Sequence, residues 1–174
     1  MMLLHWLLLK VNFYHMQHYI RLISHFLIAT LCTFILASLM HSQFVLHELS
    51  EIGVTIAWSI RLSTSLDDLL GLSSGYGPII AIALLIGFSL MAVIRYKGLI
   101  TTPWLYPLAG LLAMMTMLLA MQPILNITLI AGARSPLGFA AQCLSGFVGG
   151  WVFMRLRHAI ITNKRQLKVA LKRS

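Results

Sequence analysis

Residues Pro136 to Met154 read PLGFAAQCLSGFVGGWVFM, an apolar stretch without one charged side chain. At about 1.5 Å per residue, a helix of about 20 residues crosses the hydrocarbon layer of a membrane. Polar or small residues recur along this stretch in two rows with a spacing of four, and the rows are Ala141, Ser145, Gly149 and Gln142, Gly146, Gly150. Small residues let membrane helices approach closely, and a buried amide can bond across the contact. The stretch therefore predicts a transmembrane helix at the centre of a bundle or at a homo-oligomer contact.

Three further apolar runs have the length of a membrane span, and they lie at 22–40, 78–94 and 103–121. The chain has 174 residues, of which 59% are hydrophobic and 10% charged, and its mean hydropathy is +0.88. These values lie outside the range of soluble globular proteins. Three of the four runs open with proline, which suits the first turn of a helix. The sequence predicts an all-α integral membrane protein whose spans, the fourth at 136–154, form a four-helix bundle.

The basic residues predict the orientation of this bundle. All but two of the 13 lysines and arginines lie in the N-terminal segment 1–21, the loop 95–102 or the tail 155–174. The exceptions, Arg61 and Arg134, lie in the connections 41–77 and 122–135. The positive-inside rule therefore predicts a multi-pass protein of a bacterial inner membrane with both termini in the cytoplasm and these two connections outside.

The first run has a rival interpretation as a cleaved signal peptide. It is longer than the apolar core of a usual signal, and Met40-His41-Ser42 offers no small-residue cleavage site. We therefore expect it to remain as a membrane anchor.

The net charge of +9 follows from the same topology. The tail carries a basic stripe at Lys164, Lys168 and Lys172, and each basic residue near an anionic leaflet contributes about 1 kcal/mol. The tail is expected to dock on anionic lipid. It has no Phe, Tyr or Trp to stack on bases, so no nucleic acid is expected as a partner.

The connection 41–77 has helical periodicity. Apolar residues recur at intervals of three or four, and they are Leu46, Leu49, Gly53, Ile56 and Ile60. This pattern, with Trp58 suited to the headgroup layer, predicts one external amphipathic helix lying in the membrane interface. Ser65 stands three residues before Asp68, as in a capping box, and predicts the start of a second, short helix.

All four acidic residues fall in this connection, and they are Glu48, Glu51, Asp67 and Asp68. Arg134 is the only cation of the other external connection. We expect these five side chains to form an external charge cluster in which Arg134 pairs with an acid.

The stretch VLHELSEIG at 45–53 resembles part of a zinc-peptidase helix. Those helices carry H-E-x-x-H, in which two histidines bind the metal and the glutamate acts as base. Here Glu51 stands where the second histidine would be, so His41, His47 and Glu51 are an incomplete set of metal ligands without an evident enclosed pocket. Water and an arginine partner are the preferred surroundings, and no metal is assigned.

Other potential ligands have simpler interpretations. Met114, Met117 and Met121 form a stripe that favours packing over copper binding. His25 is the only histidine inside an expected span, so a haem held by two histidines is not expected. No cofactor is therefore predicted.

The sequence contains no nucleotide-binding loop, nucleophile elbow or paired intramembrane acids. It favours an accessory, assembly or scaffold component without catalysis of its own, whose partners are the lipid bilayer and a membrane protein or a second copy. One alternative is a small transporter or channel, with metal ions among its candidate substrates and Gln142 in a polar path. Another is a membrane metalloenzyme that uses the external histidines and carboxylates.

Overall fold

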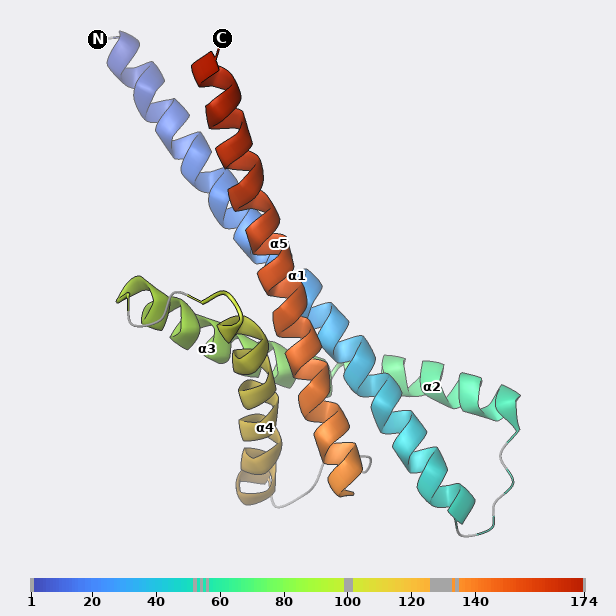
Figure 1. Ribbon diagram of the computed structural model, residues 1–174. Coiled ribbons are helices and arrows are strands. Elements are labelled where there is room, and N and C mark those ends of the chain that lie inside the picture. Colours follow the sequence, from blue (N-terminus) through green and yellow to red (C-terminus); the bar gives the residue numbers. More distant parts are fainter. Residues whose placement is uncertain are drawn as a thin grey trace.

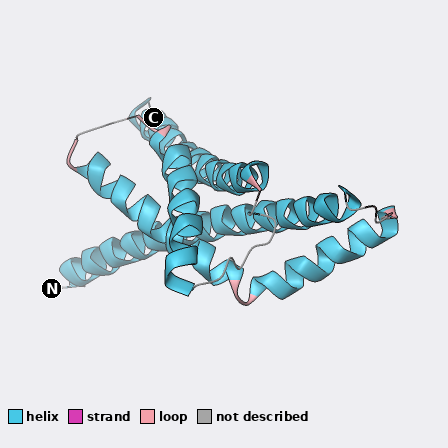
Figure 2. Ribbon diagram, turned by 90° about the horizontal axis from the view of Figure 1, so that it is seen from below, coloured by secondary structure: helices cyan, strands magenta, loops and turns pink. Residues whose placement is uncertain are grey.

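The computed structural model is built from helices. It describes the backbone of residues 2–51, 53, 55, 57–98, 102–125, 133 and 135–173, and the side chains of 16, 17, 19–51, 53, 55, 57–98, 102–121, 133 and 135–158. No strand occurs among these residues (Figure 2). The expectation of an all-α protein is confirmed for the part of the chain that the structure describes.

The described part of the chain forms five α-helices, and they are α1 (Met2–Glu51), α2 (Trp58–Ser73), α3 (Tyr76–Tyr96), α4 (Leu105–Leu125) and α5 (Pro136–Arg173). The most extensive contacts join α5 to α4 and to α1. In Figure 1, α4 runs alongside the first half of α5, whereas α2 and α3 extend sideways from the long pair α1 and α5. Both ends of the chain lie at the same end of that pair in this view.

Among the described residues, three helical stretches are long and apolar enough to cross a membrane. They are Tyr19–Glu51, Tyr76–Tyr96 and Pro136–His158, and they contain 18-residue windows with mean hydropathies of 2.1, 2.5 and 1.4. The described apolar part of α4, Leu105–Met121, is shorter. Three of the four expected spans thus lie in helices that are long and apolar enough to cross a membrane.

Small residues let α5 lie against α1 and α4. A methyl group at Gly146 would overlap the carbonyl of Gly110, and one at Gly149 would overlap the hydroxyl of Thr33. Gly146 thus faces α4, and Gly149 faces α1. Because the obstacle at Gly146 is backbone, the approach of α4 and α5 there depends on the absence of a side chain.

The prediction of one amphipathic helix running from Leu46 to Ile60 is wrong. Instead α1 continues to Glu51, Gly53 adopts a φ of +92°, and α2 begins at Trp58. A φ in this left-handed region suits glycine and ends the helix. Leu46, buried in α1, and Ile60, half exposed on α2, therefore belong to different helices.

The expected start of the second helix is also wrong. Ser65 lies in the middle of α2, where its hydroxyl donates a hydrogen bond of 2.8 Å to the carbonyl of Arg61. A serine that bonds the carbonyl four residues back is a helix-interior residue, whereas a capping serine accepts from a free N–H.

The two terminal segments continue the spans as helix. Residues 2–21 belong to α1, and residues 155–173 belong to α5. The side chains of Lys164, Lys168 and Lys172 lie outside the described residues, so lipid docking by the tail stays a prediction.

Candidate functional site

Gln142 joins three helices inside the bundle. Its side-chain N–H donates to the carbonyl of Ala37 in α1 over 2.9 Å, and the hydroxyl of Tyr76 in α3 donates to its carbonyl oxygen over 2.9 Å. Gln142 and Tyr76 are both fully buried. An unpaired polar group away from water costs about 1–3 kcal/mol, so each partner supports the other's position. Both ends of the amide thus serve contacts between helices.

A second polar contact holds α2 against the end of α1. The hydroxyl of Ser42 donates to Asp68 over 2.7 Å. Beside it, Gln43 donates to the hydroxyl of Ser65 over 3.2 Å and accepts a hydrogen bond of 3.3 Å from Arg61. These bonds connect α1, which contains Ser42, to α2, which contains Asp68. They thereby position the short helix α2.

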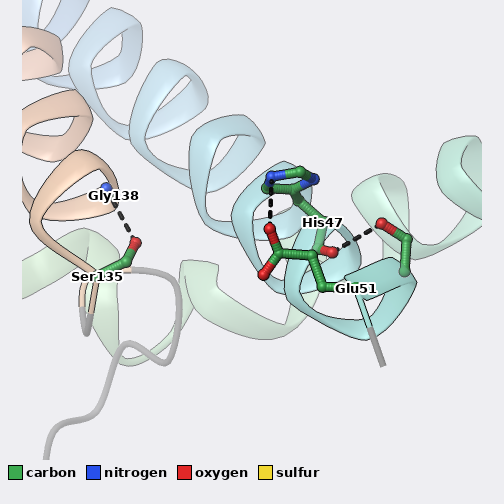
Figure 3. Close-up of polar contacts among 5 residues, drawn as sticks. His47, Glu51, Ser135 and Gly138 are labelled. Carbon is green, nitrogen blue, oxygen red and sulfur yellow. Dashed lines mark hydrogen bonds and ion pairs between the residues drawn. The ribbon is translucent and has the colours of Figure 1, made fainter. Parts of the chain in front are cut away.

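His47 and Glu51 point toward one another on the last turns of α1 (Figure 3). Their Nε2 and Oε1 atoms are 3.5 Å apart, and the two side chains are 64% and 67% exposed. Such an exposed pair, charged only when the imidazole is protonated, contributes little to stability. His41 is partly buried on an earlier turn. No group of three or more His, Cys, Asp or Glu side chains able to hold a metal occurs among the described side chains.

The four acids expected to form one external charge cluster all lie among the described residues. Asp68 accepts from Ser42, Glu51 lies beside His47, and Glu48 and Asp67 are exposed. Arg134 lies outside the described residues, so its pairing with an acid stays a prediction.

The α4–α5 contact ends in an arginine and tyrosine cluster formed by Arg95, Tyr106 and Arg157. Arg157 donates a hydrogen bond of 2.6 Å to the hydroxyl of Tyr106, and the guanidinium carbons of Arg95 and Arg157 each lie 5.5 Å from the centre of its ring. Tyr106 is buried against Phe88 and Phe153, whose ring centres are 5.9 and 5.1 Å away. Both arginines therefore have a fixed aromatic platform.

Sequence reasoning missed this cluster because its members belong to three helices. In the sequence, Arg95 and Arg157 indicated only the orientation of the spans, and Tyr106 lay inside an apolar run. The available signal was the position of each residue near the same end of its span, which a topology diagram places on one side of the membrane.

An apolar groove lies between α3 and α4. Its volume is about 640 Å³. The two helices lie close together at Gly87, where an added methyl group would lie 3.0 Å from the side chain of Ala113. Among the described lining residues, Thr116 alone carries a hydroxyl, whereas much of the rest is Ala, Ile, Leu or Met. An aqueous solute therefore has few groups to bond in this groove.

The methionine stripe faces the packed interior. Met114, Met117 and Met121 are all buried, and Met117 and Met121 also line the groove. A flexible thioether side chain fills irregular apolar space, which suits both positions.

Comparison with known proteins assigns no family to this chain. No family model matches the chain, and no match was found among curated proteins or solved structures.

Proposed function

We propose that this chain is a four-span protein of a bacterial inner membrane, with both termini in the cytoplasm. It acts as an accessory or assembly component without catalysis of its own, and the groove between α3 and α4 receives an apolar transmembrane helix of a partner membrane protein. The distribution of Lys and Arg supports the orientation. The groove between α3 and α4 is the observation that supports the proposed accessory function.

The lining of the groove favours a helix as its occupant. Small residues are spread along both of its walls, and they are Ala83, Gly87, Ala109, Ala113 and Ala120. Small residues expose backbone to a neighbour and allow close helix approach, which is the main source of helix association in a membrane. The lining extends from Ile79 to Ile94 along α3, so the occupant must be apolar over most of a span.

The buried polar groups support an accessory role over transport or catalysis. Gln142, the polar residue that would line a transport path, has partners on α1 and α3 at both ends of its amide. The histidine and carboxylate pair of His47 and Glu51 lies on an exposed surface, whereas a catalytic metal needs a shaped and partly dry site.

Site-specific photo-crosslinking in native membranes tests the proposal. A benzophenone side chain at Ile86 faces the groove, and the same group at Leu85 is the matched control, since Leu85 is similarly exposed but does not line the groove (56% and 53%). We expect the Ile86 position, and not the Leu85 position, to crosslink to a transmembrane segment of one membrane protein that also co-purifies in mild detergent.

A second pair of variants tests whether the groove must be open. Thr116→Trp fills the groove from an exposed position and should abolish the crosslink. Leu119→Trp, on an exposed part of α4 outside the lining, should leave it unchanged. Adducts with lipid alone would refute helix docking, and adducts between two copies of this chain would replace the partner with a homo-oligomer.

A further inference from the structure

The cluster of Arg95, Tyr106 and Arg157 brings two positive charges to one ring. Since each guanidinium carbon lies 5.5 Å from the ring centre, the two carbons are separated by no more than twice that distance. Attraction to the ring face offsets part of the cost of holding each cation there. It does not neutralise their mutual repulsion, because salt screens partly buried charges less than it screens exposed ones.

The chain supplies no acidic side chain to this cluster. Its four acids lie between Glu48 and Asp68, which belong to the end of α1 and to α2. Arg95 instead lies in the last turn of α3, and Arg157 lies just past the middle of α5. In the described structure Asp68 bonds Ser42, and Glu51 lies beside His47. An external anion is thus the natural complement of the two guanidinium groups.

We propose that Arg95 and Arg157 together bind one phosphate group, supplied by an anionic phospholipid headgroup or by free phosphate. Guanidinium donors match phosphate oxygens in paired hydrogen bonds, and one phosphate can accept from more than one arginine. Both arginine side chains are only partly buried, so an anion can reach them. The bond from Arg157 to the hydroxyl of Tyr106 uses one of its five N–H donors and fixes the direction of the rest.

The surroundings of the cluster favour the lipid source. Tyr96 and Trp104, which flank it at the end of α3 and just before α4, are 92% and 55% exposed. Exposed Tyr and Trp at the ends of apolar helices lie at the level of lipid headgroups. Phospholipid phosphates are concentrated in that layer, so the site and its ligand occupy the same depth. This inference does not depend on the partner helix proposed for the groove.

Variants of the full-length protein test the site. Purified wild type, Arg95→Gln, Arg157→Gln and Lys97→Gln are compared in nanodiscs of phosphatidylcholine with and without phosphatidylglycerol. Lys97→Gln is the control because Lys97 is an exposed cation directly after α3 that is not part of the cluster. The readouts are phosphatidylglycerol retained in native mass spectrometry and the shift in Tm on adding inorganic phosphate at constant ionic strength.

We expect each arginine variant to retain about tenfold less phosphatidylglycerol than wild type, as the loss of a charged hydrogen bond predicts. Lys97→Gln should retain as much as wild type. If inorganic phosphate, and not the lipid, stabilises wild type by raising its Tm but leaves the arginine variants unchanged, the site is supported and its ligand is free phosphate. Equal losses in all three variants would show a diffuse charge effect and overturn the proposal, as would unchanged binding of both ligands. Should Arg157→Gln fail to fold, Arg95→Gln and Arg157→Lys decide the question.

Discussion

Gly150 supplies the sharpest test of how α4 and α5 pack. A methyl group at this position would overlap the carbonyl oxygen of Tyr106 and would lie 2.8 Å from the Cα atom of Pro107. These atoms belong to the backbone of α4, so no side-chain rotation can remove the clash. In Gly150→Ala the two helices must therefore move apart.

Two terms of opposite sign set the size of the effect. Alanine is favoured over glycine inside a helix by about 1 kcal/mol. Overpacking a tight contact costs about 1–3 kcal/mol, and a backbone clash belongs near the upper end of that range. We expect a net loss of about 2 kcal/mol in the free energy of unfolding, which changes the unfolding equilibrium by more than tenfold.

Gly71→Ala is the matched control. Gly71 lies within α2, and an added methyl group there has no neighbour within 4 Å. This variant should be unchanged or more stable by up to about 1 kcal/mol, because only the helix preference acts. Both variants can be measured by reversible unfolding in mixed micelles. If Gly150→Ala were as stable as Gly71→Ala, the close approach of α4 and α5 would be refuted.

Two further predictions concern the polar contacts. Gln142→Leu and Tyr76→Phe should each lower the free energy of unfolding. In a double-mutant cycle, the double variant should lose less than the sum of the two single losses by about 0.6–2 kcal/mol, the range expected for a hydrogen bond between membrane helices. Additive losses would contradict the bond between Gln142 and Tyr76. Asp68→Ala removes the acceptor of Ser42 and should accelerate amide hydrogen exchange in α2, whereas Asp67→Ala, which removes an exposed neighbour, should not. Equal exchange in both variants would show that the Asp68 contact does not hold α2.

The helical elements could be predicted from composition because apolar runs of this length favour helices, which a membrane would require. An apolar run such as Pro78–Ile94 must satisfy its backbone N–H and C=O groups within the segment, and a helix does so whatever its neighbours are. The structure places this run inside α3, Tyr76–Tyr96. Periodicity was less reliable in the polar connection, where one pattern from Leu46 to Ile60 was interrupted at Gly53. A local backbone conformation there overrode the apolar spacing.

The sequence by itself determined that this protein is helical and apolar enough for a membrane, because hydrocarbon leaves the backbone few alternatives. It also marked Gln142 as a polar residue that needs partners. Only the tertiary structure decided that those partners are Tyr76 and the carbonyl of Ala37. In the same way, it alone brought Arg95 and Arg157 to the ring of Tyr106. Contacts between distant segments depend on how helices cross, and side-chain spacing within one helix does not specify that geometry.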